Sequence, residues 1–133
     1  MVADAWQPWS AESFARVRAE GRPVFVDFTA AWCVTCQMNK RVTLRSAEVM
    51  DAFRERQVVL MRADWTRRDP AITEALRALG RSGVPVYALY APQAGDPQLL
   101  SEILTVSEVK DALARWPDAA RSSAAAAAQP RLP

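Results

Sequence analysis

Apolar residues follow two different spacings along the chain, and the spacing separates predicted strands from predicted helices. Val24–Thr29 and Val58–Ala63 carry apolar and β-branched residues on both faces, as strands buried on both sides of a sheet do. Val84–Tyr90 is a third such run, with a proline near its start. The stretch Pro92–Pro97 reads as a turn, and Gln98–Leu104 is predicted as the fourth strand.

Between these strands, apolar residues recur every three or four positions, which is the spacing of helices with one buried face. Asp69 and Pro70 form the clearest helix start, because a capping acid is followed by proline in the first turn. Thr105 and Glu108 predict a capping box for the last helix. The predicted helices begin at or just after Ser10, Cys33, Ser46, Asp69 and Thr105.

This order of elements predicts an α/β fold. A strand–helix–strand crossover makes parallel neighbours, whereas the short turn at Pro92–Pro97 makes an antiparallel pair. We therefore expect a central mixed sheet of four to five strands with helices on both faces, and an extended lead-in at Met1–Trp9. One domain is expected over residues 1–116, followed by an Ala- and Pro-rich tail at 117–133 that is predicted to be disordered.

Composition narrows the classes of function. The chain has 133 residues, half of them apolar, which suffices for one domain with a real core. Its 17 basic and 15 acidic residues are scattered and give a net charge of +2, so no basic block suits a nucleic acid or an anionic membrane. No stretch approaches the roughly 18 apolar residues of a membrane span, and Met1–Ser10 lacks the order of a signal peptide.

The two cysteines, Cys33 and Cys36, stand in a C-x-x-C spacing at the predicted boundary between a strand and a helix. One such pair cannot staple a small secreted scaffold, so its purpose is expected to be chemical. The chain has no histidine, which excludes His-based acid–base catalysis and the common zinc-finger ligand sets. Gln37 follows Cys36, which excludes the C-x-x-C-H haem attachment.

A dithiol at a helix N-terminus favours redox exchange. The unpaired N–H groups and the helix dipole favour a thiolate at Cys33, which attacks a partner disulfide. Cys36, one turn further along, then attacks Cys33 and releases the reduced partner. No bound cofactor is needed, because the two cysteines carry the electrons. The alternatives are a structural disulfide, a soft-metal carrier for Cu(I) or Zn(II) with an incomplete ligand set, and a redox-inactive binding module.

Three residues near the cysteines are candidates for supporting roles. Asp27 lies within an apolar strand, where burial raises the pKa of a carboxyl and suits a proton acceptor for Cys36. Its side chain alternatively points to water or to a basic partner. Trp32 either shields the Cys33 sulfur and offers an apolar contact to a partner, or is a core residue. Pro85 marks either the start of a strand or an ordinary turn.

The phrases V-D-F-T-A-A-W-C-V-T-C-Q, A-D-W-T-R-R-D-P and G-V-P-V-Y resemble the thioredoxin superfamily. Within it they are similar to the C-terminal thioredoxin-like domain of the DsbD (DipZ/ScsB-type) transmembrane thiol:disulfide reductases, over about Arg22–Trp116. The resemblance implies a thioredoxin fold with a cis Pro85 facing the cysteines, and the backbone of Val84 open to an incoming peptide. Asp27 is then the proton acceptor for Cys36.

The resemblance also implies a cellular setting. It implies a periplasmic domain of an inner-membrane protein that takes electrons from the membrane-embedded part and reduces a periplasmic partner. We expect the domain to be a monomer with no metal site. One departure stands out, because some relatives carry an acid where this chain has Lys40. Lys40 is expected to favour the thiolate, so the redox potential of those relatives does not transfer.

Overall fold

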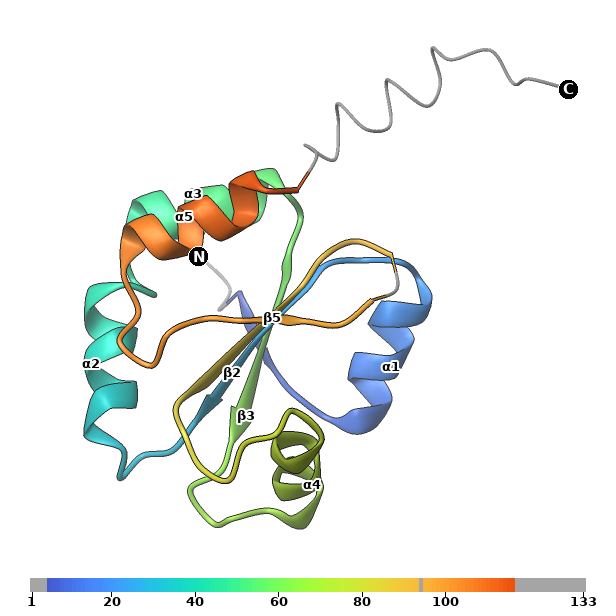
Figure 1. The fold of residues 1–133 in the computed structure, drawn as a ribbon, viewed down its shortest axis with the longest axis vertical. Coiled ribbons are helices and arrows are strands. Elements are labelled where there is room, and N and C mark those ends of the chain that lie inside the picture. Colours follow the sequence, from blue (N-terminus) through green and yellow to red (C-terminus); the bar gives the residue numbers. More distant parts are fainter. Residues whose placement is uncertain (1–4, 94, 117–133) are drawn as a thin grey trace, which may run out of the picture.

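The computed structural model describes residues 5–93 and 95–116, and the tail predicted to be disordered at 117–133 lies outside the described residues. Its centre is a five-stranded sheet in the order β1-β3-β2-β4-β5 (Figure 1). The fold class predicted from the sequence, a mixed sheet between helices, is confirmed. The strands are β1 (Trp6–Pro8), β2 (Val24–Thr29), β3 (Val59–Asp64), β4 (Val86–Tyr90) and β5 (Gln98–Leu99).

Strands β1, β3 and β2 run parallel, while β4 is antiparallel to β2, and β5 to β4. The central strand β2 has the predicted bounds and is buried along its whole length. The lead-in near the N-terminus is itself an edge strand, in which Trp6 is the register partner of Leu60. Its proline stands at an edge, where a missing ladder donor is tolerated.

The helices begin where the capping residues predicted them. Each is capped by the side chain of the residue before it, which accepts a backbone N–H of the first turn. Pro70 occupies the first turn of α4, as predicted. The helices are α1 (Ala11–Ala19), α2 (Val34–Val42), α3 (Ala47–Glu55), α4 (Pro70–Ala78) and α5 (Val106–Ala114).

Two expectations for the C-terminal part are wrong in detail. The fourth predicted strand, Gln98–Leu104, is a strand only at Gln98–Leu99. The chain leaves the sheet after Leu100, whose N–H donates to the carbonyl of Tyr87. Thr105 caps α5, but the carboxylate of Glu108 accepts from the N–H and hydroxyl of Ser101 instead of closing a capping box.

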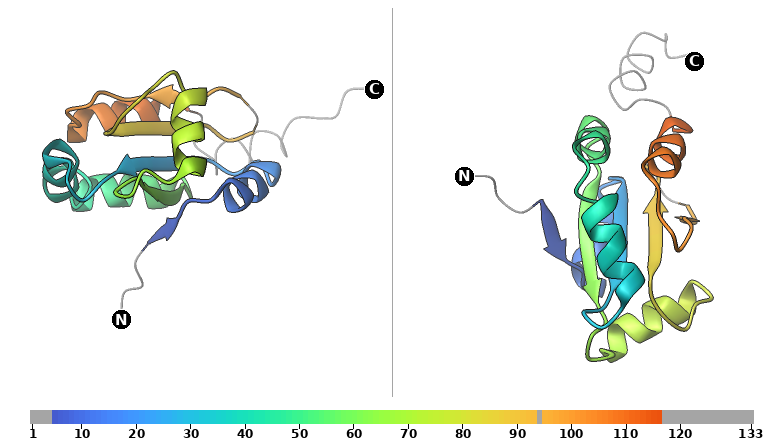
Figure 2. Two further views of the ribbon diagram at one scale, coloured as in Figure 1. Left: turned by 90° about the horizontal axis from the view of Figure 1, so that it is seen from below. Right: turned by 90° about the vertical axis from the view of Figure 1, so that its left-hand side faces the viewer.

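Helices cover both faces of the sheet, and the sheet separates the two large clusters of the core. Figure 1 shows α1 and α4 on one side and α2, α3 and α5 on the other, and Figure 2 shows the same layers from two other sides. Alternate β2 side chains, such as Val26 and Phe28, pack with α1 and α4. Phe25 faces the opposite way, against α3 and α5. No helix in the described part of the chain is long and apolar enough to cross a membrane.

Candidate functional site

Three loops meet at one end of the sheet. Because β2 and β3 are parallel, their carboxyl ends lie together, and β4 begins at the same end because it is antiparallel (Figure 1). The loop after β2 carries Cys33, the loop after β3 carries Thr66, and Pro85 directly precedes β4. The fold therefore brings together stretches that are up to about fifty residues apart in sequence.

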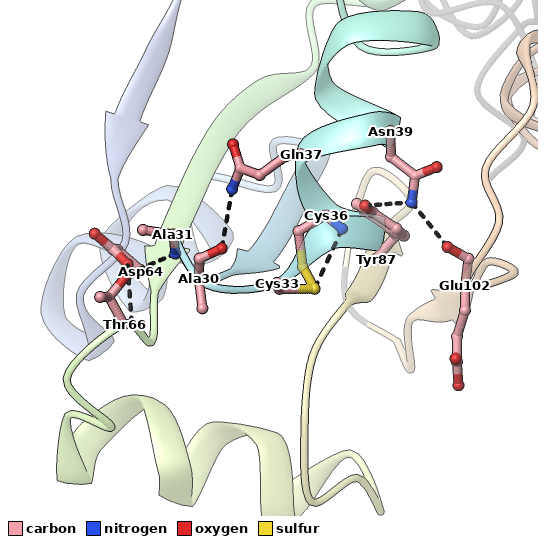
Figure 3. Close-up of a disulfide and its surroundings, with 10 residues drawn as sticks. All are labelled: Ala30, Ala31, Cys33, Cys36, Gln37, Asn39, Asp64, Thr66, Tyr87 and Glu102. Atoms are coloured by element: carbon pink, nitrogen blue, oxygen red, sulfur yellow. Dashed lines mark hydrogen bonds between the residues drawn. A yellow bond between two sulfur atoms is a disulfide. The ribbon is translucent and has the colours of Figure 1, made fainter.

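Cys33 and Cys36 form a disulfide across the first turn of α2, with their Cα atoms 5.2 Å apart (Figure 3). Cys33 is the N-cap residue, and its sulfur accepts the backbone N–H of Cys36 at 3.2 Å. The predicted position at a helix N-terminus is confirmed. Cys33 is 8% exposed and Cys36 is fully buried, so Cys33 is the more accessible residue of the two. In this disulfide form it is less exposed than was expected of a reactive thiolate.

Trp32 stands beside the disulfide and is 49% exposed. Its indole Nε1 donates to the carbonyl of Thr66 at 3.0 Å, and the Thr66 hydroxyl accepts the N–H of Ala31 at 2.8 Å. The guanidinium of Arg68 lies 5.2 Å from the rings of both Trp32 and Trp65. The loop after β3 is thus tied to the cysteine loop, and Trp32 is a surface residue rather than a core one.

Val84 and Pro85 border the disulfide from the β4 side. The peptide bond between them is cis, as the family resemblance implied. The side chain of Val84 packs against Ala30 and the two cysteines. Within the described residues, no backbone hydrogen bond is found at Val84. The structure places this segment next to the cysteines, while its role in holding a partner peptide stays a prediction.

Asp27 lies on the α2 side of the sheet, in a row across three strands. Its register partners are Arg62 on β3 and Tyr87 on β4. The Arg62 Nε donates to Asp27 Oδ2 at 3.2 Å, whereas the second oxygen, Oδ1, is buried and has no hydrogen-bond partner. Both sequence interpretations therefore hold in part, since the carboxyl is fully buried and also faces a basic partner.

Burial decides the electrostatics of Asp27. Removal from water raises the pKa of its carboxyl, and the positive charges of Arg62 and Lys40 offset this only in part. The burial of Tyr87 itself, together with the charge of Asp27, raises the pKa of the Tyr87 phenol. A carboxyl in this state takes up a proton more readily than a surface acid, which is the property that a proton acceptor for Cys36 needs.

Asn39 is a buried polar residue that the sequence pattern did not single out. Its amide nitrogen donates to the Tyr87 hydroxyl and to the carbonyl of Glu102, both at 2.8 Å (Figure 3). Its oxygen accepts the N–H of Leu104 at 3.2 Å. Thr43, one turn later, donates to the carbonyl of Leu104 at 2.7 Å. These bonds fix the cysteine-bearing helix to β4 and to the loop before α5.

Within residues 5–93 and 95–116, no cluster of three or more His, Cys, Asp or Glu side chains is arranged to hold a metal ion. The groups gathered at this end of the sheet are instead a disulfide, a buried carboxyl and an exposed indole. Together they suit the exchange of disulfide bonds, because a helix N-terminus favours a thiolate at Cys33 after reduction.

Comparison with known proteins finds a family model and several relatives that are similar to this chain. A family model described as thioredoxin-like matches residues 5–92. The thiol:disulfide interchange protein DsbD of Vibrio cholerae is 33% identical over 85 residues, which is 64% of this chain and 14% of that protein. The Escherichia coli K12 protein of the same name is 32% identical over 79 residues, or 59% of this chain and 14% of that protein. The chain thus spans about a seventh of these relatives.

Solved structures agree on the fold. The C-terminal domain of Neisseria meningitidis DsbD in its oxidised form superposes with a TM-score of 0.63 at 21% identity, covering 81% of this chain and 96% of that domain. A thioredoxin from Thermus thermophilus gives a TM-score of 0.65 at 24% identity, covering 83% of this chain and 84% of that protein. At these identities the superpositions establish the architecture alone.

Proposed function

The chain belongs to the thioredoxin-like family, and from that premise we propose that it is a thiol:disulfide oxidoreductase that reduces disulfides in partner proteins. One observation carries the proposal: the C-x-x-C pair is joined as a disulfide at the N-terminus of α2, with Cys33 as the N-cap. A pair at this position is oxidised and reduced without rearrangement of the fold, because its sulfurs lie within bonding reach across one helical turn.

The exchange proceeds in two balanced steps. The thiolate of reduced Cys33 attacks one sulfur of a partner disulfide, so that a mixed disulfide forms and the other partner sulfur leaves as a thiolate, which takes up a proton. Cys36 then loses its proton and attacks the Cys33 sulfur. The bond to the partner breaks and the Cys33–Cys36 disulfide is restored. The released partner sulfur leaves as a thiolate and takes up a proton, so that the partner is now a dithiol. Two electrons pass from the chain to the partner.

The neighbouring residues have separate tasks in this scheme. Asp27 takes the proton that Cys36 loses, which its raised pKa and its place beneath α2 support. Trp32 and Val84 border Cys33 and contact the partner segment, the first through its exposed ring and the second through its backbone, with Pro85 holding that backbone beside the sulfurs. Lys40 does not pair with a carboxylate directly, and its charge offsets a small part of the rise in the pKa of Asp27.

The relatives suggest where this chemistry takes place. The similar proteins from Vibrio cholerae and Escherichia coli are thiol:disulfide interchange proteins, and a similar solved structure is the C-terminal domain of DsbD. We propose that this chain is the corresponding periplasmic domain of an inner-membrane protein. In this setting a membrane-embedded redox domain supplies the electrons and a periplasmic domain or protein receives them, with the chain acting as a monomer.

Cysteine variants test the proposal. The prereduced chain is expected to reduce insulin disulfides, and Cys36→Ser is expected to accumulate a mixed disulfide, since the second attack is lost. Cys33→Ser serves as the matched control, because it keeps one thiol in the same turn and lacks the proposed nucleophile. Non-reducing electrophoresis and mass spectrometry detect the adduct. Trapping by Cys33→Ser instead of Cys36→Ser would reverse the assignment, and failure of the intact chain to reduce insulin would overturn the function.

A further inference from the structure

The large apolar side chains that remain exposed gather at the cysteine-bearing helix. Val34 is 82% exposed and Val42 is 65% exposed, although both lie on a helix of a well-packed domain. Ile103 is 57% exposed and stands between Glu102 and Leu104, whose carbonyls accept hydrogen bonds from Asn39 of α2 and from the cap residue Thr43. In the described part of the chain, the exposed large apolar residues are Trp32, Val34, Met38, Val42 and Ile103.

Val34, Met38 and Val42 form a stripe along the outer face of α2. They are four residues apart, so successive members lie one above the other. With a rise of about 1.5 Å per residue, the stripe runs for about 12 Å from the disulfide toward the end of the helix. A continuous apolar stripe that faces solvent lowers solubility and does not stabilise the fold. Such a stripe is typical of an interaction surface.

A basic cavity adjoins this stripe. Its volume is about 640 Å³, and it opens between α2, α3 and the edge of the sheet at β1 and β3. No acidic side chain is among the described residues that line it. At about 100° per residue, Arg41 points between the apolar stripe and Lys40, so the two features share one helix. The lining residues are Ala5, Trp6, Gln37, Lys40, Arg41, Leu44, Arg45, Met50, Arg54 and Arg62.

Three of the five cations at the cavity lack a directly bonded acid. Arg54 pairs with Asp51, and Arg62 pairs with Asp27 while lying 4.2 Å from the ring of Trp6. Within residues 5–93 and 95–116, no ion pair or hydrogen bond is found for the side chains of Lys40, Arg41 and Arg45. A local excess of positive charge in a chain whose net charge is +2 favours a negatively charged occupant.

We propose that the outer face of α2 and the adjoining basic cavity bind an acidic segment of the disulfide-bearing partner protein. Apolar side chains of the segment lie on the Val34–Met38–Val42 stripe, and its carboxylates enter the cavity near Arg41 and Arg45. The inference rests on the proposed function, and it adds the chemical class of the partner. Since the stripe begins directly after Cys33, a segment bound along it holds its disulfide at the reactive end of the helix.

The apolar stripe and the basic cavity together favour an acidic protein segment over other occupants. A free inorganic anion fills the cavity but leaves the apolar stripe in water. A second copy of the chain brings a second basic cavity, so the like charges repel when the same face is used on both copies. An acidic segment with apolar residues matches the charge of the cavity and covers the stripe at once.

Two cystine-linked peptides of equal length provide the probe. One carries four glutamates and two leucines around its cysteine, and the other carries lysines in place of the glutamates. The prereduced chain is expected to reduce the acidic peptide about tenfold faster than the basic one at low salt, with the ratio falling toward one in high salt. The double variant Arg41→Glu/Arg45→Glu is expected to abolish or reverse this ratio, and Arg41→Gln/Arg45→Gln to reduce it.

The matched control is Arg16→Glu/Arg115→Glu, which makes the same charge change at exposed positions on α1 and at the end of α5. It is expected to keep the tenfold preference apart from a small general effect of net charge. Circular dichroism and thermal melting establish that each variant is folded. Equal losses in the control and in the Arg41/Arg45 variants would overturn the docking site.

The remaining outcomes separate this inference from the proposed function. If the intact chain reduces neither peptide, the proposed function fails. If it reduces both at the same rate, the oxidoreductase stands and the docking site is wrong. Inorganic phosphate is compared with sodium chloride at equal ionic strength, and a much stronger loss of preference in phosphate would overturn the acidic-segment proposal in favour of a small-anion site.

Discussion

The two faces of α2 reverse the usual arrangement of a helix in a globular domain. Its inner face carries Cys36 and Asn39, and the cap residue Thr43 continues that face; all three are buried. Its outer face carries Val34 and Val42, which are largely exposed. A surface helix normally buries its apolar residues and exposes its polar ones. Here hydrogen bonds hold the helix in place, and apolar contact remains available on the outside.

This difference separates the contacts that anchor α2 in the fold from the surface that is proposed to bind a partner. The inner face is bound by specific partners, since Asn39 and Thr43 together reach Tyr87, Glu102 and Leu104. The outer face makes no comparable contact within the described residues. Substitutions of Asn39 and Thr43 on the inner face are therefore expected to change the free energy of unfolding, whereas substitutions on the outer face are expected to change the rate with partner proteins.

The largest effect is expected from Asn39→Leu, which keeps the approximate volume and removes every side-chain hydrogen bond of Asn39. The Tyr87 hydroxyl, the Glu102 carbonyl and the Leu104 N–H then lose a partner in a buried or half-buried setting. We expect a loss of about 3 kcal/mol in the free energy of unfolding. Urea denaturation of the oxidised protein measures it.

A second substitution sharpens this prediction. In a Tyr87→Phe background one of the abandoned partners is already absent, so Asn39→Leu is expected to cost about 1 kcal/mol less than in the intact protein. Equal costs in both backgrounds would show that the Asn39–Tyr87 bond contributes nothing, and the inner face would then be held by the loop before α5 alone.

A smaller and pH-dependent effect is expected beneath the inner face, at Asp27. Because burial raises the pKa of Asp27 in the folded protein, the folded state holds the proton more tightly than the unfolded state. The resulting stability is present below the ordinary carboxyl value of about 4 and is lost as the pH rises through the raised pKa. Asp27→Asn, neutral at every pH, is expected to raise the melting temperature at pH 7 and to leave it nearly unchanged below pH 4.

Thermal melting of the oxidised protein at several pH values measures this effect, with Asp51→Asn as the surface control. Asp51 pairs with Arg54 on an exposed helix face, where an ion pair contributes little. A gain in melting temperature that is the same at pH 4 and pH 7 would contradict the raised pKa of Asp27.

Most of the fold follows from local rules that the sequence displays. β2 has the predicted bounds because its apolar run is limited by a glycine and a proline on one side and by the cysteine loop on the other. The starts of α3 and α4 were predicted because Ser46 and Asp69 cap them through their own side chains. The positions of Cys33 and Cys36 follow from the same rule, since a strand ends and a helix starts there.

The features that could not be predicted from the sequence depend on contacts between residues that are distant along the chain. The side chain of Glu108 was expected to close a capping box. Instead its carboxylate accepts a hydrogen bond from the hydroxyl of Ser101, which lies near it after the chain leaves the sheet. Asn39 looks like an ordinary helix surface residue until Tyr87 and Leu104 are placed around it. The apolar sequence of β2 did place Asp27 among buried residues, but its pairing with Arg62 depends on the register of β3, which local sequence does not give.

The smallest effect is expected on the outer face, from Val42→Ser. The side chain is 65% exposed, so its loss removes little buried area, and the change in the free energy of unfolding is expected to stay within about 0.5 kcal/mol. Urea denaturation beside Asn39→Leu compares two residues of one helix under one set of conditions. A cost for Val42→Ser close to that of Asn39→Leu would mean that the stripe is packed in the isolated chain, and an outer face already covered in this way has no room for a partner.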